Sequence, residues 1–268
     1  MTDPELSARK ASIGYGRRLV VDGLDLQIPP ARFTALLGPN GSGKSTILRS
    51  LAGLQPLHAG AILLDGKAIA SLPTKSVARR IGFLAQGATA PEGMTVLDLV
   101  RQGRYPHRTV FGGWNKADTA AVEQALALTS TGHLRHHKLD TLSGGQRQRA
   151  WIAMTLAQQG GILLLDEPTT YLDLAHQIDL LELARDLIQT QGTTVVAVLH
   201  DLNQAARYAD HLVLLKDGRI HSSGTPIATL TAPAIAKVFG VEVAILTDPE
   251  TGTPLCLPRK SRTARKPM

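Results

Sequence analysis

A glycine-rich segment between two apolar runs limits what this chain can fold into more than any other feature. The segment follows a strand-like run, Phe33 to Leu37, and opens a helix-like run that reaches Leu51; it reads Gly38-Pro39-Asn40-Gly41-Ser42-Gly43-Lys44-Ser45-Thr46. Strand, glycine-rich loop and helix in this order are typical of a phosphate-binding loop, whose backbone N–H groups wrap a phosphate where no Cβ atom stands in the way. Lys44 is expected to reach the β and γ phosphates and Ser45 to bind Mg²⁺. We therefore predict a nucleoside triphosphate site.

Short apolar runs separated by helix-like segments predict an α/β fold. Strands that are apolar on both faces and joined by helices indicate a parallel sheet that is covered on each side. The runs of strand length are Phe33 to Leu37, Ile81 to Leu84, Ile162 to Leu165, Thr194 to Leu199 and Leu212 to Leu215. Together they predict a mainly parallel sheet as the core.

Two regions are expected beside this core. Leu24 to Ile28 and Ala61 to Leu64 alternate apolar with other residues near Gly and Pro, which suits a small N-terminal antiparallel sheet. Val96 to Gln102 and Ala117 to Leu128 follow helical patterns in a part of the chain without strand-like runs. We therefore expect a helical subdomain at about 87–141 that continues into a helix ending near Gln158.

The end of the chain carries two turn signals and a basic tail. Lys216 to Arg219 and Thr247 to Gly252 lie between short apolar runs, as in β-hairpins. The second hairpin predicts a C-terminal β appendage at about 240–258. We expect one domain over 1–258, followed by a disordered basic tail at 259–268; contact of this tail with anionic lipid or nucleic acid is the alternative.

Composition excludes several classes of protein. With 268 residues, 43% of them hydrophobic, the chain can bury a large core. A single cysteine, Cys256, excludes an internal disulfide and the thiolate clusters of zinc or iron–sulfur centres. The formal charge of +7 owes five of its positive charges to the last ten residues, so no nucleic-acid partner is expected. No run approaches the roughly 20 apolar residues of a membrane span, and no secretion signal is recognised, so the chain is expected to stay in the cytosol.

Two acidic residues follow the most apolar of the strand-like runs. Asp166 and Glu167 come directly after Ile162 to Leu165 and before Pro168. Neighbouring residues of a strand point to opposite sides, so the two acids should have different roles. Asp166 suits the Mg²⁺ shell and Glu167 suits the attacking water. The alternative is a pair of acids that caps a turn before the proline.

A second glycine-rich helix start lies between these two segments. It reads Leu142-Ser143-Gly144-Gly145-Gln146-Arg147-Gln148-Arg149, and its exposed amides form a second candidate anion site. The phosphate loop, this LSGGQ sequence upstream of the ILLLDEP strand, and the histidine after Val195 to Leu199 together resemble the nucleotide-binding subunit of an ABC transporter. The resemblance covers about Leu6 to Pro258. It implies an α/β fold: a P-loop ABC ATPase with a mainly parallel sheet core, an N-terminal antiparallel β subdomain and a helical subdomain.

The resemblance also implies a working dimer. In this family two subunits pair head to tail, and the LSGGQ of one closes on the ATP held by the phosphate loop of the other, which agrees with two anion sites per chain. The contacts of the γ-phosphate across the dimer would be Ser143, Gly144, Gly145 and Gln146. Lys44, Ser143 and His200 would stabilise charge on the transferring group while Glu167 polarises water.

Four further residues match positions of known function in this family. Gln86 matches the glutamine that reaches Mg²⁺ and the attacking water, and Asp173 belongs to the loop between subunits. Tyr15 matches the aromatic that stacks on adenine, and His200 the switch histidine at the γ-phosphate. From the residues alone, an exposed tyrosine in a turn and a structural histidine are the alternatives.

Longer segments point to a subfamily. Thr169 to Gln177, Arg101 to Phe111, Gln146 to Met154, Leu199 to Asp210 and the C-terminal DPETGTP resemble the ATPases of bacterial ferric-siderophore importers. This resemblance implies an ATPase peripheral to the cytoplasmic face of the plasma membrane, with a separate permease and, indirectly, a substrate-binding protein. Heme or cobalamin import is the first alternative, and a soluble ABC ATPase acting on nucleic acid or ribosomes is the second. Tyr105, Phe111 and Trp114 are candidate permease contacts, or else parts of a satellite core.

Overall fold

The computed structural model describes residues 5–109, 112–170 and 172–259. Phe111, Tyr171 and the predicted tail beyond Arg259 lie outside these ranges. The elements run in chain order as β1 Leu6–Tyr15, β2 Arg18–Ile28, β3 Phe33–Leu37, α1 Lys44–Leu51, β4 Leu57–Leu64, β5 Lys67–Ala68, η1 Ile69–Ser71, α2 Thr74–Ala78, β6 Ile81–Leu84, α3 Val96–Gln102, η2 Tyr105–His107, α4 Lys116–Leu128, η3 Gly132–Leu134, η4 Leu139–Thr141, α5 Gly144–Ala157, β7 Ile162–Leu165, α6 Leu174–Gln191, β8 Thr194–Val198, α7 Leu202–Tyr208, β9 His211–Lys216, β10 Arg219–Gly224, α8 Pro226–Thr229, α9 Ala232–Phe239, β11 Val243–Thr247 and β12 Pro254–Pro258.

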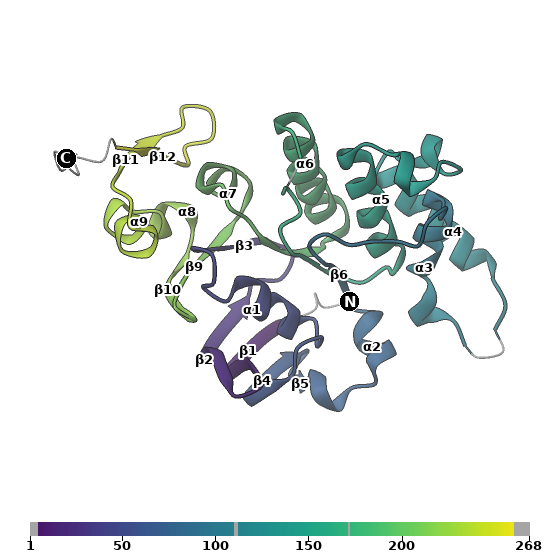
Figure 1. The fold of residues 1–268 in the computed structure, drawn as a ribbon, viewed down its shortest axis with the longest axis horizontal. Helices are drawn as coiled ribbons and strands as arrows, with labels where there is room; N and C mark the ends of the chain where they lie inside the picture. Colours follow the sequence, from purple (N-terminus) through teal and green to yellow (C-terminus); the bar gives the residue numbers. More distant parts are fainter. Residues whose placement is uncertain (1–4, 110–111, 171, 260–268) are drawn as a thin grey trace, which may run out of the picture.

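A six-stranded sheet crosses the middle of the molecule (Figure 1). Its order is β10-β9-β3-β8-β7-β6, and every neighbouring pair is parallel except β10 with β9. Phe33 and Leu37 of β3 point into the core under α6 and α7, and Leu36 points into the core around α1. Because both faces are covered, the strands are apolar without interruption. The predicted parallel α/β core is confirmed.

A smaller antiparallel sheet, β2-β1-β4-β5, lies on the other side of α1 (Figure 1). Its inner face and α1 share one hydrophobic cluster with the central sheet, built on residues such as Leu6, Ile13 and Leu48. The pairing of β1 with β4 shifts register beside Gly60, whose φ is 79°. A Cβ at Gly60 would lie 2.2 Å from the carbonyl oxygen of Lys10, so only glycine fits this bulge. The predicted antiparallel subdomain is confirmed.

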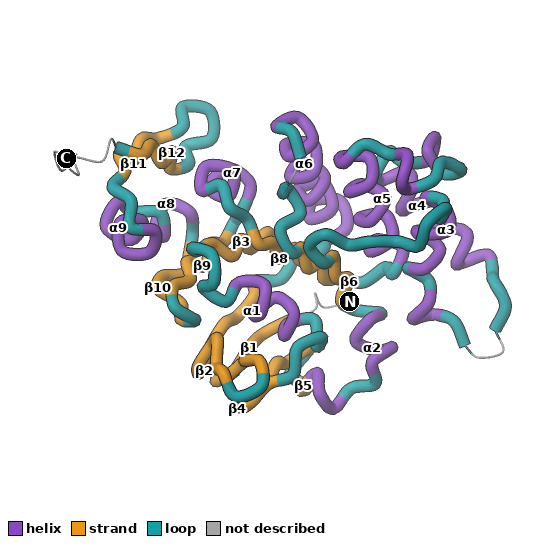
Figure 2. Tube along the Cα trace, in the orientation of Figure 1, coloured by secondary structure: helices purple, strands orange, loops and turns teal. Residues whose placement is uncertain are grey.

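Helices α3, α4 and α5 form a third region at one end of the molecule (Figure 2). They enclose their own cluster of buried side chains, among them Val100, Leu126 and Ala153. Tyr105 and Trp114 lie outside this cluster, with 66% and 39% of their surfaces exposed. Lys75 stands over the Tyr105 ring and Arg101 over the Trp114 ring. The satellite-core alternative is therefore wrong for these two aromatics.

A buried ion pair stabilises this helical region. Arg104 Nε lies 2.9 Å from Asp118 Oδ1, and only 4% and 3% of the two side chains are exposed. The same guanidinium donates to the carbonyl oxygen of Ala157 and to Gln159, at the end of α5. Burial raises the pKa of Asp118, but hydrogen bonds from Arg104 and the Asn115 backbone, with the charge of Arg104, hold it below its usual value.

Replacing Arg104 with methionine is expected to lower the free energy of unfolding by about 3–5 kcal/mol, because Asp118 would be left buried without its cation. The control is Arg135→Met, which breaks the exposed pair of Arg135 with Glu123 and should cost below about 1 kcal/mol. Chemical denaturation of both variants measures the difference. Equal losses in the two variants would contradict this account.

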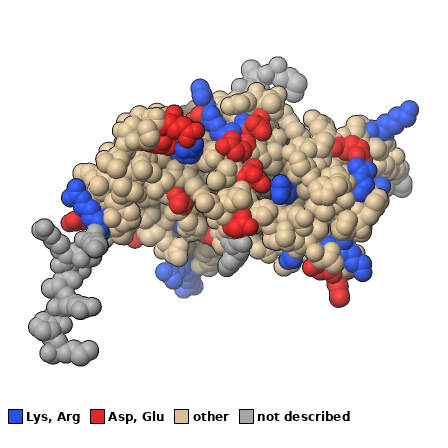
Figure 3. Space-filling model, turned by 90° about the horizontal axis from the view of Figure 1, so that it is seen from above, with Lys and Arg blue, Asp and Glu red and all other residues tan. Residues whose placement is uncertain are grey.

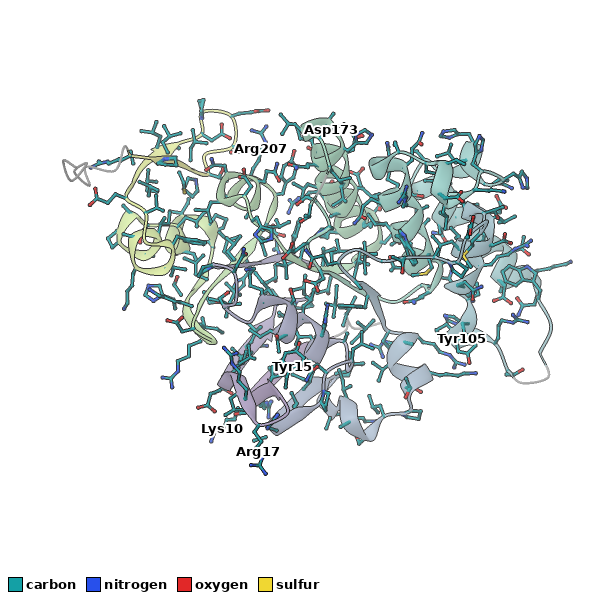
Figure 4. The ribbon with its side chains drawn as sticks, in the orientation of Figure 1. Lys10, Tyr15, Arg17, Tyr105, Asp173 and Arg207 are labelled. Carbon is teal, nitrogen blue, oxygen red and sulfur yellow. The ribbon has the colours of Figure 1, made fainter. Side chains whose placement is uncertain are left out.

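The C-terminal hairpin, β11 with β12, packs beside α7 at the other end of the molecule. Arg207 of α7 pairs with Asp248 at 3.0 Å and also with Glu250 (Figure 4). The side chain of Asn203 accepts a hydrogen bond from the backbone N–H of Cys256 at 2.7 Å. The hairpin that the turn residues predicted is present, and it is tied to the helix that follows His200.

Acidic and basic side chains are interspersed on the face seen in Figure 3. In the described part of the chain, no helix combines the length and the apolar content needed to cross a membrane.

Candidate nucleotide site

The phosphate loop connects the C-terminal end of β3 to α1, as predicted. Gly41 and Gly43 have φ values of 80° and 97°, which favour glycine, and Gly43 forms the N-cap of α1. Lys44 is buried, and its Nζ donates to the carbonyl oxygens of Gly38 at 2.8 Å and Pro39 at 3.1 Å. Burial lowers the pKa of Lys44 below its ordinary value, and the charges of Glu167 and Asp166 offset this only in part. The ammonium group is thus held at the base of a loop built to surround an anion.

A cleft of about 430 Å³ opens over this loop. It is bounded by the loop, by the start of α1, and by residues that follow β6, β7 and β8. Its lining consists of Val20, Asn40, Gly41, Gly43, Lys44, Ser45, Thr46, Gln86, Glu167, Thr170 and His200. Gly38, Pro39 and Ser42 belong to the same loop beneath it. The fold therefore gathers at one edge of the sheet residues that lie as far apart in the chain as Val20 and His200.

The oxygen atoms at the floor of the cleft suit a magnesium ion. Ser45 Oγ donates to Asp166 Oδ1 at 2.7 Å. Asp166 Oδ2 is buried and accepts no hydrogen bond from the described residues, although Arg49 Nε lies 3.6 Å away. Burial raises the pKa of Asp166 above its ordinary value, and the Ser45 hydrogen bond and the Arg49 charge offset this only in part. A hydroxyl and a carboxylate with a spare oxygen are ligands that Mg²⁺ accepts, so the residues fit the ion.

Three side chains hold the carboxylate of Glu167 at the wall of the cleft. Gln86 Nε2 donates to Glu167 Oε2 at 2.6 Å, and Thr170 Oγ1 donates to the same oxygen at 3.2 Å. His200 Nε2 lies 3.0 Å from Glu167 Oε1. Glu167 has a φ of 51°, an uncommon value for a residue with a side chain. The three neighbours thus determine where the carboxylate points.

Thr170 and Val20 line the cleft, but sequence reasoning assigned neither of them to the site. Thr170 belongs to the segment Thr169 to Gln177, whose pattern indicates a subfamily but no role for this hydroxyl. A hydroxyl three residues after an acid in a tight turn is the signal that could have indicated the contact.

The LSGGQ residues lie outside this cleft. Ser143 and Gln146 form a capping box at the start of α5: Gln146 N donates to Ser143 Oγ at 3.3 Å, and Ser143 N donates to Gln146 Oε1 at 3.1 Å. Gly144 is exposed, and Gly145 is buried against His176 of α6. A Cβ at Gly145 would lie 2.2 Å from Cδ2 of the His176 ring, so a larger residue at this position would require the ring to move.

Asp173 and Tyr15 also lie outside the cleft. Asp173 caps α6 and accepts from the backbone and the ring Nδ1 of His176, at 2.9 and 2.7 Å. These hydrogen bonds hold the pKa of Asp173 below its usual value. Tyr15 ends β1 and is half exposed. In Figure 4 the two residues lie on opposite sides of the central sheet. One copy of the chain therefore does not bring all the predicted site residues together.

Comparison with known proteins agrees with this geometry. The family model for the ABC transporter matches residues 21–170. The ferric enterobactin transport ATP-binding protein of Escherichia coli is 51% identical over 94% of this chain and 93% of its own length. The petrobactin import ATP-binding protein FpuD of Bacillus anthracis is 49% identical over 97% and 96%. A cobalamin import ATP-binding protein of Halobacterium salinarum is 42% identical over 91% of this chain and 61% of its own length.

Solved structures are similar as well. An inward-facing structure of a transporter described as metal-chelate type matches with a TM-score of 0.83 and 30% identity, over 97% of this chain and 98% of that one. A dimeric ATP-binding cassette bound to ADP and Pi matches with a TM-score of 0.72 and 27% identity, over 82% of this chain and 98% of that one. Sequence, fold and site agree, and the chain belongs to the ABC transporter family as an ATP-binding subunit.

Proposed function

We propose that this chain is the ATP-hydrolysing subunit of an importer for ferric siderophores, and that it works as a head-to-tail dimer with a separate permease. The observation that carries the catalytic part is the Glu167 carboxylate, which three side chains hold in the same cleft as the phosphate loop. A carboxylate in that place can accept a proton from water that attacks the γ-phosphate.

The residues of the cleft divide the work of hydrolysis. Backbone N–H groups of the loop and the ammonium group of Lys44 bind the β and γ phosphates. Ser45 and Asp166 would hold Mg²⁺, which neutralises charge on the phosphate oxygens when it is bound. Glu167 takes a proton from water as the water oxygen bonds to the γ-phosphorus and the bond to the ADP oxygen breaks. Gln86, Thr170 and His200 orient the carboxylate, and His200 also lines the space for the γ-phosphate.

The dimer follows from the two separated anion sites. The start of α5 has backbone N–H groups that could bind an anion, but it lies outside the nucleotide cleft of its own chain. A twofold axis that places this helix start over the partner's cleft satisfies both sites at once. Ser143, Gly144 and Gln146 would then reach the partner's γ-phosphate, with Gly145 shaping the turn. The dimeric relative bound to ADP and Pi supports this arrangement.

An apolar groove of about 730 Å³ is the proposed docking place of the permease. It lies between the end of α1, β4, α2, β6 and the end of α5, and residues that line it include Leu54, Leu57, Leu72, Val77, Phe83 and Gln158. Phe83 belongs to β6, and Gln86 follows two residues after that strand. A permease segment seated in the groove would therefore contact β6. A movement of β6 would shift Gln86, which contacts Glu167. With the permease docked there, the chain would lie peripherally at the cytoplasmic face of the plasma membrane.

The cargo is proposed from the relatives, because the ATPase subunit does not touch it. The ferric enterobactin and petrobactin proteins match nearly the whole chain at about half identity. The cobalamin import protein matches at 42% and extends well beyond this chain. These similarities favour a ferric siderophore over cobalamin.

Uptake by cells that lack this chain tests the proposal. Radiolabelled ferric siderophores, heme and cobalamin are supplied to such cells, which are complemented with wild-type protein or with Glu167→Gln. We expect siderophore uptake to be lost and to return only with the wild-type protein. A defect in heme or cobalamin uptake alone would overturn the cargo, and normal uptake of all three would favour a soluble factor instead.

A further inference from the structure

A polar contact between α6 and α7 links the two segments that orient Glu167. Thr170 lies in the loop between β7 and α6, and His200 lies immediately before α7; both contact the carboxylate. Gln177, in the second turn of α6, touches both segments. Its contacts lie away from the cleft, and none of the sequence motifs predicts a role for them.

Gln177 is anchored to the loop through its amide nitrogen. Gln177 Nε2 donates to the carbonyl oxygen of Leu172 at 2.9 Å and to that of Thr169 at 3.4 Å. Carbonyl oxygens can only accept, so these two contacts determine which way the amide faces. Its oxygen is left for a donor on the opposite side. The hydrogen-bond pattern therefore gives this side chain one orientation.

The donor on the opposite side comes from α7. Gln204 Nε2 donates to Gln177 Oε1 at 2.7 Å, and the backbone N–H of Gln204 donates to Asp201 Oδ1 at 2.8 Å. Asp201 is the N-cap of α7 and follows His200 directly. The contacts form a closed path: Glu167 to Thr170, the loop to Gln177, Gln177 to Gln204, and α7 back through His200 to Glu167.

We propose that Gln177 is a positioning residue that keeps the Thr170 loop and the His200 helix in register, and so aims the Glu167 carboxylate. This inference rests on the proposed function, because it takes Glu167 as the base for ATP hydrolysis. Gln177 touches neither the phosphate loop nor the Mg²⁺ ligands, so nucleotide binding should not depend on it. Small misplacements of a catalytic group can cost up to about a hundredfold in rate, and the loss should appear in kcat.

Two single variants break the path on either side of Gln177. Gln177→Glu places an oxygen against the carbonyls of Leu172 and Thr169 while it still accepts from Gln204. Gln204→Leu removes the contact from α7 and leaves both loop contacts in place. We expect each to lower kcat for ATP about tenfold, with KM for ATP and Tm close to wild type. Gln189→Glu, the same chemical change at an exposed position of α6, should leave kcat unchanged.

The double variant separates a shared path from two independent effects. If Gln177 joins the two segments, Gln177→Glu with Gln204→Leu should lose about as much kcat as either single variant, about tenfold rather than about a hundredfold. Multiplied losses, an unchanged kcat, or a loss confined to KM would overturn the proposal. If Gln177→Glu lowers Tm markedly, Gln204→Leu decides alone, and an unchanged kcat there overturns it. The proposed function is tested separately, by ATP hydrolysis that the wild-type protein performs and Glu167→Gln loses. A failure of this inference therefore leaves the proposed function standing.

Discussion

Replacing Glu167 with glutamine is expected to slow ATP hydrolysis by about 10²–10⁴-fold while ATP binding is retained. The amide has nearly the shape of the carboxylate, so the cleft and the phosphate loop should be undisturbed. It cannot take a proton from water, however, and the attacking oxygen would have to lose its proton without a base. Because ATP then stays intact, the closed dimer should persist.

Phosphate release and size-exclusion chromatography with ATP measure the two halves of this expectation. The variant should bind ATP with near wild-type affinity and elute as a dimer, whereas the wild-type protein returns to its starting state as ATP is consumed. Glu242→Gln, the same change at an exposed position of the C-terminal region, is the control and should keep full turnover. Normal turnover by Glu167→Gln would remove this residue from the role of base.

Replacing Lys44 with alanine is expected to weaken ATP binding by at least about thirtyfold. Lys44 is a buried cation at the base of the loop, and truncation of one partner of a buried charge pair typically costs about 2–5 kcal/mol of binding free energy. The carbonyl oxygens of Gly38 and Pro39 would also lose their donor, so the loop itself should become less ordered.

Calorimetric titration with ATP and Mg²⁺ measures this loss directly. Lys67→Ala, at an exposed position of β5, is the matched control and should leave the affinity unchanged. A melting temperature near that of the wild-type protein is needed to assign the effect to the site and not to unfolding. Unchanged affinity of Lys44→Ala would contradict the assignment of the phosphate loop.

Local patterns predicted the parts of the fold that depend on neighbouring residues. The strand, loop and helix around Lys44 lie in one short stretch, and the apolar strands show their burial on both faces directly in their composition. Strand alternation also predicted that Asp166 and Glu167 face different partners. The two acids do face different partners, Ser45 for Asp166 and Gln86 for Glu167, but they lie beyond the end of β7 at Leu165, and Glu167 has a positive φ, so strand alternation is not the reason.

Contacts between distant segments could not be predicted in this way. The hydrogen bond from Thr170 to Glu167 depends on a turn, and the path through Gln177 and Gln204 depends on how α6 packs beside α7. Nothing in the local pattern around Gln177 distinguishes it from Gln189, which is exposed on the same helix. The predicted domain limits and the assignment of Tyr15 to adenine remain predictions.

The contact of Gly145 with His176 has a consequence for exchanging parts between transporters. The imidazole ring occupies the space that a larger residue at position 145 would need, and its hydrogen bond to Asp173 favours this position of the ring. A helical region transplanted from a relative carries its own helix start but not the ring against which that start fits. In functional chimeras, the junctions should therefore be placed so that Gly145 and the first turn of α6 come from the same parent protein.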